Sequence, residues 1–593
     1  MLREEICKQV NQAVNQAYPD ITDTLIIEKP KNPEHGDFAV NVSPLARYAK
    51  VPPVKIAETI AQHINIDDVE ISIIAGFINF KAGKSKLNQC VEKIMTEGEN
   101  FSRNNLGNSE KVMLEYVSAN PTGPMHIGHG RWAATGSALA NLLKFSGYDV
   151  FQEFYINDAG NQMNNLVESF IIRIYQVKSY GLSIPEDEKG KKKYYPGEYL
   201  IDLARKYTKK NPDKFKEILK YFNVPEYIPE LGSYIIAGSE YASRVNQPKL
   251  FALWNELTQY AYQNILDQQK ELLARLRVNF DNWFTESSLY EKDEVKAAIQ
   301  KLEESGKLYE KDGAVWFKSS DYGDDQDRVI IKKDGTYTYL TADIAYHYDK
   351  IRRGFERLIN IWGADHHGYV ARVKASIEAM GRDSNCLEVL LGQMVNLVMS
   401  GGQVRMGKRT KMITLEELVD EVGVDGTRYW MIMRDINTTL DFDVDLAKSC
   451  SDDNPVYYAQ YAHARACSIL RTAVSERVDR ETGEVLPPLM QSLDFDSRFD
   501  ALWKEESEPT KNLILRLESF EDVVLVAAKC RAPYMIARYI QDLAKDFHHF
   551  YTFTRVLNVE EDVMKARLRL VQATKQVLAN AFAILGVSAP ERM

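Results

Sequence analysis

Apolar residues recur at helical spacing at the start of the chain and in strand-like runs soon after it. The opening segment MLREEICKQVNQAV alternates charged and apolar residues every three or four positions, which predicts an amphipathic helix. The elements expected after it are a turn around Pro33–Gly36, a helix through Lys55–His63, a strand pair at Val69–Phe80 and a helix near Lys86–Glu97. Residues 1–108 therefore predict a small α+β domain.

The pattern changes at Val112–Ala119, which predicts a buried strand. Pro121, Gly123 and Pro124 prevent a helix from following at once. Helical periodicity then runs from about Ile127 to Phe145, and YDVFQEFYIND predicts a second strand. The result is a βαβ unit whose loop lies at the carboxyl end of its first strand, where open parallel sheets bind nucleotides.

A long helical, polar and lysine-rich stretch at about 165–325, interrupted by WFTESSLY, predicts an insertion into the sheet domain. Sheet-like apolar segments return at Arg328–Leu340 and Leu358–Gly363, and helices dominate after Asp443. The expected fold is an α/β, Rossmann-like parallel-sheet domain over 109–442 with this helical insertion. The α+β domain precedes it, and an all-α bundle over 443–593 follows it.

Composition narrows the class of protein. Of the 593 residues 45% are hydrophobic and 27% charged, which is ordinary for a soluble globular protein. The net charge of −10 argues against a general nucleic-acid binder, although local basic patches could still hold a structured RNA. There is no apolar run of about 18 residues and no signal peptide, so we expect a cytoplasmic protein without a membrane segment. The six cysteines form no CxxC pair, which favours free thiols over zinc or disulfides.

The segment PTGPMHIGHGR carries the clearest chemistry. It comprises Pro121, Thr122, Gly123, Pro124, Met125, His126, Ile127, Gly128, His129, Gly130 and Arg131. His126 and His129 are three residues apart and share one face of the first helical turn, where free N–H groups favour anions. Gly128 leaves room for a nucleotide, so the segment suits stabilisation of a triphosphate attacked at its α-phosphorus. The alternatives are incidental histidines at a helix start or a zinc site, for which no further ligand lies at a familiar spacing.

A strand followed by PxGxxHxGH resembles the ATP signature of class I aminoacyl-tRNA synthetases, and LEYVSANPTGPMHIGHGR is similar to the bacterial arginine enzymes. The resemblance spans nearly the whole chain. It continues through PEHGDFAVN, YINDAGNQ, YLTADIAYH, GADHHGYVARV, TLDFDVDLA, QYAHARACSI and VLANAFAILGVSAPERM.

This resemblance implies a pocket for arginine. A guanidinium presents a planar fork of donors and pairs with carboxylates in matching geometry. The family implies Glu115 and Asp343 as these carboxylates and Tyr339 closing the pocket. Ser118 and Asn120 match positions that hold the amino-acid end. From the residues alone, Asp343 is equally an N-cap of a helix and Glu115 a surface strand residue.

Two further segments complete the expected active site. Asp365, His366 and His367 follow an apolar strand and suit ribose hydroxyls or phosphate, although adjacent histidines are often just polar loop residues. RMGKR stands where the family has KMSKS, a mobile loop that binds the phosphates. Arg405, Lys408 and Arg409 still give a cationic loop that can clamp pyrophosphate, the alternative being a solvated basic loop.

Candidate RNA contacts lie at both ends of the chain. GFINF resembles the family's contact with the outer corner of tRNA, where Phe77 would stack on a base and Asn79 would bond its edge. From the residues alone, Phe77 and Phe80 favour a place in the core. The C-terminal candidates for the anticodon are Tyr534, Arg538, Phe547 and Tyr551, a mixture that a helical bundle also produces.

The implied reaction joins L-arginine to tRNA(Arg) through an arginyl-adenylate made from ATP. Mg²⁺ is expected with the triphosphate, no zinc is expected, and the family default is a monomer. The family also suggests that bound tRNA is required before the adenylate forms. Two rivals stay open, a class I synthetase of other specificity and a non-catalytic RNA binder of synthetase descent.

Overall fold

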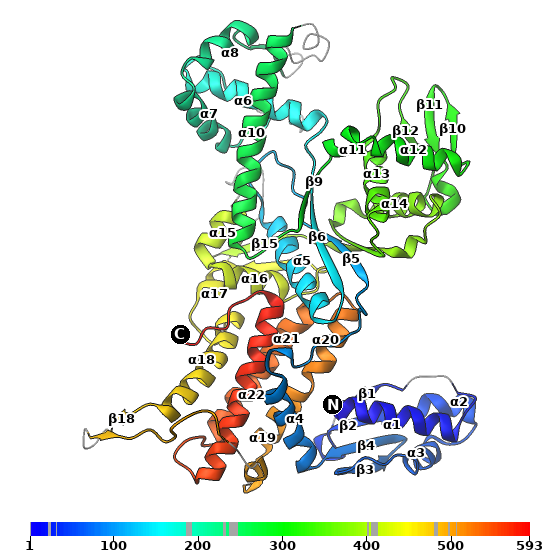
Figure 1. The fold of residues 1–593 in the computed structure, drawn as a ribbon, viewed down its shortest axis with the longest axis vertical. Coiled ribbons are helices and arrows are strands. Elements are labelled where there is room, and N and C mark those ends of the chain that lie inside the picture. The colour runs from blue at the N-terminus through cyan, green and yellow to red at the C-terminus, as the bar shows by residue number, and fades with distance from the viewer. Residues whose placement is uncertain are drawn as a thin grey trace. The chain divides into compact units, whose positions relative to one another are not determined.

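The chain forms two compact units, residues Gly107–Lys448 and residues Met1–Leu106 together with Ser449–Met593 (Figure 1). We describe each unit by itself. The computed structural model describes residues 2–21, 25–30, 32–184, 193–228, 233–236, 247–399, 402–404, 413–478, 484–495, 499–505 and 507–593.

A five-stranded parallel sheet organises the unit Gly107–Lys448, with strand order β14-β13-β5-β6-β9. The strands are β5 (Lys111–Glu115), β6 (Asp149–Ile156), β9 (Asn282–Thr285), β13 (Arg357–Gly363) and β14 (Leu387–Gly392). Val112, Met113 and Leu114 of β5 are all fully buried, as expected of a central strand covered on both faces. Helix α5 (Ile127–Phe145) connects β5 to β6, so the predicted βαβ unit and Rossmann-like fold class are confirmed.

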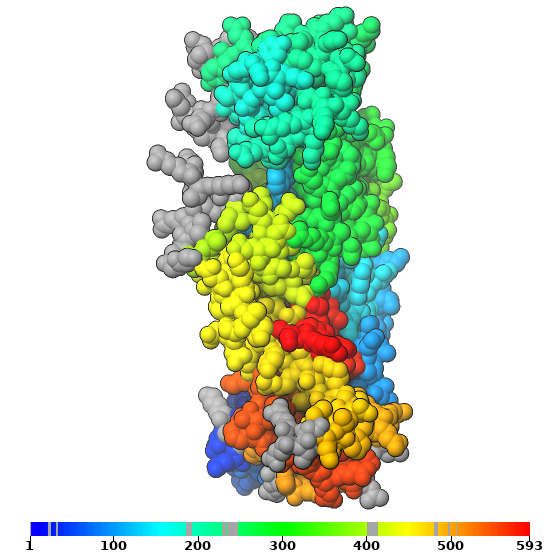
Figure 2. Space-filling view, turned by 90° about the vertical axis from the view of Figure 1, so that its left-hand side faces the viewer, coloured from blue at the N-terminus to red at the C-terminus, as the bar shows by residue number. Residues whose placement is uncertain are grey.

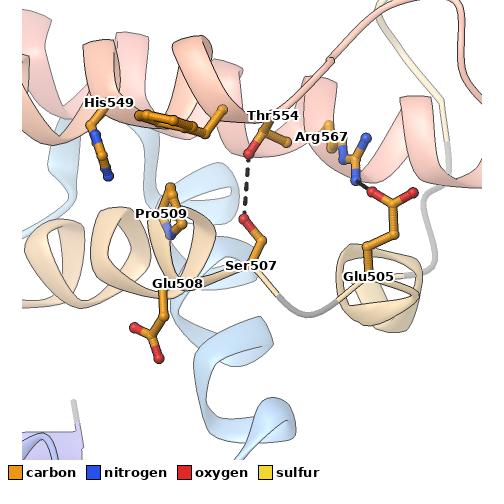
Figure 3. Close-up of a pocket in the computed structure, with 8 residues that line it drawn as sticks. Glu505, Ser507, Glu508, Pro509, His549, Thr554 and Arg567 are labelled. Carbon is orange, nitrogen blue, oxygen red and sulfur yellow. Dashed lines mark hydrogen bonds and ion pairs between the residues drawn. The ribbon is translucent and has the colours of Figure 1, made fainter.

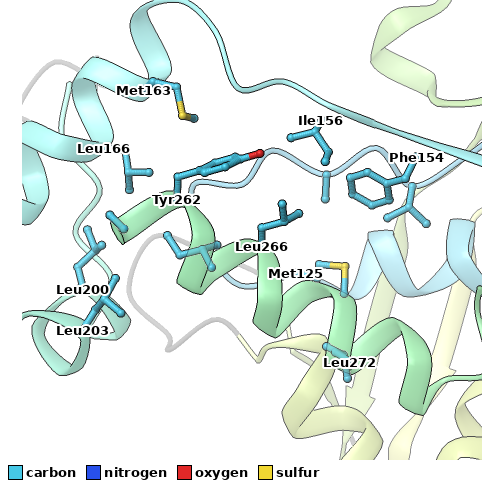
Figure 4. Packing of buried hydrophobic residues seen from close by; sticks show 14 of the residues in the cluster. Met125, Phe154, Ile156, Met163, Leu166, Leu200, Leu203, Tyr262, Leu266 and Leu272 are labelled. Atoms are coloured by element: carbon cyan, nitrogen blue, oxygen red, sulfur yellow. The ribbon is translucent and has the colours of Figure 1, made fainter. Parts of the chain in front are cut away.

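Between β6 and β9 the chain forms a helical region built on one apolar cluster. Its elements are α6 (Asn161–Val177), α7 (Tyr199–Lys210), α8 (Lys214–Phe222), the hairpin β7 (Glu226–Ile228) with β8 (Ser233–Ile235), and α10 (Pro248–Arg275). Leu266 of α10, Leu200 of α7 and Leu166 of α6 pack in the same core as Met125, just before α5 (Figure 4). Burial of this shared core joins the region to the loop that precedes α5.

The predicted limits of the insertion, about 165–325, are wrong at their C-terminal end. WFTESSLY does not merely interrupt helices, because Asn282–Thr285 pairs in parallel with Glu153–Ile156 as an edge strand of the main sheet. After it come α11 (Ser287–Glu291), α12 (Glu294–Glu304) and an antiparallel sheet of β10 (Leu308–Lys311), β11 (Ala314–Phe317) and β12 (Arg328–Ile331). A four-residue strand is too short for hydrophobic periodicity to reveal it within polar text.

The rest of this unit continues from the small sheet back to the main one. Its helices are α13 (Tyr339–Arg352), α14 (His367–Ala379), α15 (Leu415–Val422), α16 (Val424–Ile432) and α17 (Val444–Lys448). A second small sheet has the order β16-β15-β17, made of Gly402–Val404, Val395–Met399 and Leu440–Asp443. Arg428 of α16 is fully buried and donates to Ser137 Oγ of α5 at 2.7 Å, which fixes these two helices to each other.

The other unit combines both ends of the chain. Its N-terminal part contains α1 (Leu2–Ala17), α2 (Ala46–Ala49), α3 (Pro53–Ala61), α4 (Lys84–Glu97) and the antiparallel sheet β1 (Ile27–Glu28), β2 (Phe38–Asn41), β4 (Phe77–Ala82) and β3 (Val69–Ile74). Its C-terminal part contains α18 (Pro455–Val474), α19 (Glu508–Glu518), α20 (Phe520–Lys529), α21 (Tyr534–Phe553) and α22 (Glu561–Leu585), with the hairpin β18 (Arg477–Val478) and β19 (Val485–Leu486).

The two parts of this unit lie side by side, dark blue against orange in Figure 2. Helix α4 packs on α19 and α22, and Asn580 Nδ2 donates to the Gly98 carbonyl at 3.0 Å. Lys93 and Glu521 form an ion pair at 2.5 Å across the same contact. The predicted small N-terminal α+β domain and C-terminal helical bundle are both present.

Candidate active site

The chain leaves the sheet after β5 through two residues with left-handed backbone angles, Val117 (φ 70°) and Ser118 (φ 40°). Residues other than glycine rarely adopt such angles, and they persist where surrounding contacts fix them. Here Ser118 Oγ donates to Glu115 Oε1 at 3.1 Å and accepts the main-chain N–H of Tyr155 at 3.2 Å. The turn is therefore tied to both β5 and β6 at the carboxyl edge of the sheet.

The first turn of α5 holds its two histidines against each other. His126 is the N-cap residue, and the ring centroids of His126 and His129 lie 3.6 Å apart in a stacked arrangement. Burial lowers the pKa of His126, and burial with the neighbouring His126 lowers the pKa of His129 to about 3. The main-chain N–H of His126 donates to His129 Nδ1 at 3.2 Å, so the neutral His129 ring carries its proton on Nε2. At neutral pH this helix start therefore offers neutral imidazoles and free N–H groups, an arrangement suited to phosphate.

The Trp132 side chain packs between this helical turn and the ends of β13 and β14, at Gly363 and Gly392. Its ring lies 5.4 Å from the His129 ring and fills the space above Gly392, where a Cβ would lie 2.0 Å from Trp132 Nε1. A Cβ on Gly363 would lie 2.5 Å from Asp365 Oδ1 and 3.4 Å from the Trp132 ring. The GADHHG segment thus lies beside the histidine turn because two glycines permit close approach.

Asp365, His366 and His367 are exposed at this edge. His366 Nε2 lies 3.8 Å from Asp365 Oδ2. All three follow β13 directly, through a short 3₁₀ helix at Ala364–His366 and the start of α14. Their accessibility is compatible with a role at ribose or phosphate.

Arg131, although part of the motif, has a different task. Its side chain is fully buried and donates to the carbonyl oxygens of Gln393 at 3.1 Å, Thr438 at 2.6 Å and Asp435 at 2.8 Å. A guanidinium so engaged fixes α5 to the segments before β15 and β17 and does not face a ligand.

The other motif residues form the walls and the backbone of the turn. Buried among them are Pro121, Thr122, Met125, Ile127 and Gly130. Gln269 Nε2 of α10 donates to the Gly123 carbonyl at 2.9 Å and to the Asn120 carbonyl at 3.1 Å, which anchors the loop from outside.

Residues immediately after the RMGKR segment return to the histidine turn. Leu415 N–H donates to the Met125 carbonyl at 3.0 Å, and Thr414 forms a bridge with His126. Thr414 also caps α15 together with Glu417. Arg405, Lys408 and Arg409 themselves lie outside the described residues.

A cluster of acidic side chains lies at the same carboxyl edge of the sheet. Its first member, Glu115, is the last residue of β5, the strand that precedes the histidine turn. Glu115 is buried and its Oε2 lies 2.6 Å from Lys350 Nζ, so the alternative of a surface strand residue is excluded. Asp343 lies in the second turn of α13, whose N-cap is Thr338, so the N-cap alternative is excluded as well.

The carboxyl group of Asp343 has a raised pKa. Burial raises the pKa of its carboxyl to about 7, and the negative charges of Glu115 and Glu286 act in the same direction. The positive charge of Lys350 and a hydrogen bond with Tyr369 oppose this rise. A site that disfavours a second and third negative charge favours an incoming cation for the same reason.

Sequence reasoning missed Glu286. This residue precedes α11 and is buried, its Oε2 accepts the Tyr155 hydroxyl at 3.0 Å, and burial raises its pKa. The omission follows from assigning WFTESSLY to an insertion, since the residue after an edge strand lies at the same sheet edge as Glu115. Lys350 was missed too, although its spacing of seven residues from Asp343 places both on one helix face.

Two expected pocket residues lie outside the buried cluster. Tyr339, the first residue of α13, is 70% exposed. Asn120 is also exposed, and the hydrogen bond with Gln269 uses its main chain. Both positions are accessible from solvent, as a residue that meets an entering substrate must be.

Comparison with known proteins decides the family. The profile of the class I (R) tRNA synthetase catalytic domain matches residues 90–223 and 236–439. The profile of the arginyl tRNA synthetase N-terminal domain matches residues 4–82, and that of the DALR anticodon binding domain matches residues 459–593. The chain belongs to the arginyl-tRNA synthetase family.

Individual relatives agree over the whole length. The arginine–tRNA ligase of Geobacillus thermodenitrificans is 42% identical over 602 residues, covering 100% of this chain and 99% of the relative. That of Bacillus subtilis is 41% identical over 600 residues, covering 100% and 98%. The arginyl-tRNA synthetase structure from Thermus thermophilus has a TM-score of 0.74 at 22% identity, with 100% of both chains covered, and shows the same fold.

The N-terminal RNA candidates of this family member differ in accessibility. Phe77 of β4 is partly exposed. Asn79, in the central strand β4, is 2% exposed, and its Nδ2 has no hydrogen-bond partner within the described chain. The expectation that Asn79 presents its amide to a base edge is not met in this structure.

The C-terminal candidates all lie on α21, but not on one face. Arg538 and Tyr551 are exposed and Tyr534 is partly exposed. Phe547 is fully buried, so its assignment as an RNA contact is wrong. Its ring packs toward Phe550, so for this residue the alternative of an ordinary helical-bundle core holds.

A cavity of about 310 Å³ lies at the C-terminal end of α21 (Figure 3). It is lined by Glu505, Ser507, Glu508, Pro509, His549, Phe553, Thr554 and Arg567. Arg567 is nearly buried and donates to Glu505 Oε2 at 2.8 Å, while Phe553 is 70% exposed. The exposed Phe553 ring packs beside the His549 ring at 4.7 Å, and exposed aromatic rings are the surfaces on which nucleobases stack.

No helix in the described part of the chain is long and apolar enough to cross a membrane.

Proposed function

We propose that this chain activates L-arginine with ATP and transfers the arginyl group to tRNA(Arg). An arginine carboxylate oxygen attacks the α-phosphorus of ATP, the bond to the β-phosphate oxygen breaks, and pyrophosphate leaves. A hydroxyl of the terminal tRNA ribose then attacks the carbonyl carbon, and AMP leaves. Class membership implies the 2′-hydroxyl.

The observation that carries this proposal is the placement of two unlike sites at one sheet edge. The stacked His126 and His129 begin α5, and the carboxyl group of Asp343 lies near Glu115 and Glu286. Ser118 connects the two sites. Its hydroxyl donates to Glu115 of the acidic cluster, and its backbone forms the positive-φ turn that leads toward the histidines. A phosphate site and a cation site joined by one turn can align a carboxylate with an α-phosphorus.

We assign the triphosphate to the helix start. The Nε2–H of His129, the ring of His126 and the free N–H groups around Gly128 stabilise the charge that develops as pyrophosphate leaves. Asp365, His366 and His367 are assigned to the ribose or phosphates. Mg²⁺ enters with ATP as part of the substrate. Lys408, Arg405 and Arg409 keep their sequence-based role as cations for pyrophosphate.

We assign the guanidinium to Asp343, in the acidic pocket that Glu115 and Glu286 complete, with Tyr339 at the entrance and Ser118 and Asn120 near the amino-acid end. A neutral side chain would leave the Asp343 carboxylate without a cation, which rejects that side chain strongly. This difference explains how the enzyme can select arginine without an editing domain. An apolar substrate is disfavoured for the same reason, which separates this proposal from synthetases of other specificity.

We assign tRNA contacts to residues 1–108 at its outer corner and to residues 443–593 at the anticodon. Arg538, Tyr551 and Tyr534 are accessible for this role, and the cavity at the C-terminal end of α21 offers a place for a base. A requirement for bound tRNA before adenylate formation, a monomeric state and a cytoplasmic location also belong to the proposal.

The test is ATP–pyrophosphate exchange with each standard amino acid in turn, with and without tRNA. Of the standard amino acids, we expect only arginine to support exchange. We expect this exchange to depend on the presence of tRNA(Arg). Full-rate exchange without tRNA contradicts the tRNA requirement, and exchange with a different amino acid contradicts the specificity. For the rival RNA binder, His126→Ala and wild type would bind ATP equally and neither would turn over.

A further inference from the structure

Helix α13 carries a fully buried cation that the proposed reaction does not use. Lys350 Nζ lies 2.6 Å from Glu115 Oε2 and 3.2 Å from Asn360 Oδ1, above the Tyr346 ring at 4.2 Å. Glu115 and Asn360 are register partners on the neighbouring strands β5 and β13. The ammonium therefore bridges two strands at the end of the sheet that carries the candidate active site.

The partners of Lys350 lead to both ends of the proposed arginine pocket. On one side, the other oxygen of Glu115 accepts the Ser118 hydroxyl, which fixes the positive-φ turn. On the other side, Asn360 Nδ2 lies 3.0 Å from His347 Nε2, and His347 Nδ1 lies 2.8 Å from the Asp343 carbonyl. Burial lowers the pKa of His347 to about 3, so this ring is neutral; it donates from Nδ1 to the carbonyl and accepts from Asn360.

We propose that Lys350 is a positioning residue for arginine: it holds Glu115 in place and offsets its charge, so that Asp343 is the carboxylate left to meet the guanidinium. The inference rests on the proposed function. An ion taken from water into a buried site must be paired, and Glu115 is paired within the chain before any substrate arrives. Within the part of the chain that the structure describes, Asp343 has no ion pair of this kind, so its counter-charge comes from the substrate.

A purely structural role would produce different behaviour. Arg353, the C-cap residue of α13, pairs with the buried Glu153 of β6 through bonds of 2.7 and 2.8 Å. It serves as a matched control, because it also joins α13 to a sheet carboxylate but does not contact Glu115 or Asn360. Loss of either ion pair lowers the stability of the fold. Of the two substitutions, only that of Lys350 also weakens arginine binding.

The pH dependence of arginine binding separates charge from packing. Titratable and charged groups surround Asp343 and Lys350 on several elements. They are Glu115 on β5, Glu153 and Tyr155 on β6, Glu286 before α11, Tyr346 and His347 on α13, Arg353 at its C-cap, and Tyr369 on α14. Lys350 is the cation among them that lowers the pKa of Asp343. Its removal moves the ionisation of Asp343 to higher pH, so affinity lost at pH 7 is partly regained at alkaline pH.

The experiment measures L-arginine and ATP dissociation constants by calorimetry from pH 6.5 to 9 in the full chain. For Lys350→Met we expect arginine binding at pH 7 to weaken by about 30-fold or more. We expect its pH midpoint to rise by about one unit and ATP binding to change less than about 3-fold. Lys350→Arg should keep the midpoint. Arg353→Met should lower the melting temperature and leave arginine affinity unchanged.

A folded Lys350→Met protein with the wild-type midpoint and arginine affinity would overturn the proposal, and so would an equal arginine defect in Arg353→Met. If Lys350→Met does not fold, Lys350→Met with Glu115→Gln replaces the pair by neutral groups of similar shape. That double variant carries no unpaired Glu115 charge, so the proposal predicts nearly normal arginine binding, and a loss as large as that expected for Lys350→Met would overturn it. Wild-type protein that never exchanges pyrophosphate with arginine refutes the proposed function instead, whatever the Lys350 variants do.

Discussion

The main-chain N–H of His126 donates to Nδ1 of His129, and this bond leaves the ring proton of His129 on Nε2. The stacked, partly buried pair has lowered pKa values on both rings, so each is neutral at physiological pH. The histidines therefore act as hydrogen-bond donors toward phosphate and not as cations. Positive charge for the triphosphate has to come from elsewhere, namely from Mg²⁺ in the substrate and from the basic segment that contains Lys408.

Substitutions of the histidines and of Arg131 should have different effects, the first on turnover and the second on stability. His126→Ala removes a group at the phosphate site, and we expect turnover to fall by about 100-fold or more with little loss of stability. Arg131→Met removes three bonds to buried carbonyls, and we expect the free energy of unfolding to fall by about 2–4 kcal/mol. Denaturant titration and ATP–pyrophosphate exchange on both variants provide the check. A stable Arg131→Met protein that fails to bind ATP would place Arg131 at the ligand.

Arginine affinity should depend on pH around neutrality. The Asp343 carboxyl has a pKa of about 7, so much of the free protein is protonated there at pH 6. A guanidinium binds the ionised carboxylate, and binding therefore releases a proton. We expect affinity to rise from pH 6 to pH 8 and then level off, with proton release visible in calorimetry as a dependence on buffer ionisation enthalpy. A flat profile would mean that Asp343 does not meet the cation.

The same raised pKa predicts that ionised Asp343, which binds the substrate, lowers the stability of the free protein at high pH. The folded-state pKa of Asp343 lies above the unfolded value of about 3.9, so the favourable contribution of its protonated form is complete below pH 4 and is lost as pH rises through about 7. We expect Asp343→Asn to melt at a higher temperature than wild type at pH 8, with a smaller difference at pH 5. Thermal melts at the two pH values test this; equal differences would contradict it.

Glycines at the end of the sheet should control the phosphate site through Trp132. A Cβ at Gly392 would overlap Trp132 Nε1, so Gly392→Ala should displace the indole that packs on His129. We expect a loss of about 1–3 kcal/mol in stability together with a raised KM for ATP. Gly368→Ala is the matched control, since a Cβ there meets nothing within 4 Å. Equal behaviour of the two variants would show that the Trp132 contact does not matter.

On α21 the buried and exposed candidates should diverge. Phe547→Ala removes a fully buried ring, and we expect a loss of about 3–5 kcal/mol in the free energy of unfolding. Arg538→Ala changes an exposed cation, and we expect unaltered stability with a higher KM for tRNA. Aminoacylation kinetics at varied tRNA concentration, with denaturant titrations alongside, distinguish the two. A normal KM for tRNA in Arg538→Ala would remove that residue from the proposed interface.

How far sequence alone leads depends on the local signal. The limits of α5 follow from helical periodicity bounded by Pro124 and Gly147, and the structure has the same limits, Ile127–Phe145. The strand β9 does not follow, because four residues in polar surroundings carry no periodicity, and with it Glu286 was lost. The depth of Asn79 and of Phe547 depends on which other elements cover them, which no local pattern contains. Glu115 and Asp343 were selected by family resemblance, whereas their charge environment required the structure.

Arginine and ATP binding to Asp343→Ala and to wild type show whether Asp343 recognises the guanidinium. We expect arginine binding to weaken by about 30- to 1,000-fold in the variant, since one partner of the charge contact is removed. ATP binding at the histidine turn should change by less than about 3-fold, and the neutral analogue citrulline should no longer be discriminated against as strongly. An Asp343→Ala protein with wild-type arginine affinity would contradict the account, because the guanidinium would then be recognised elsewhere.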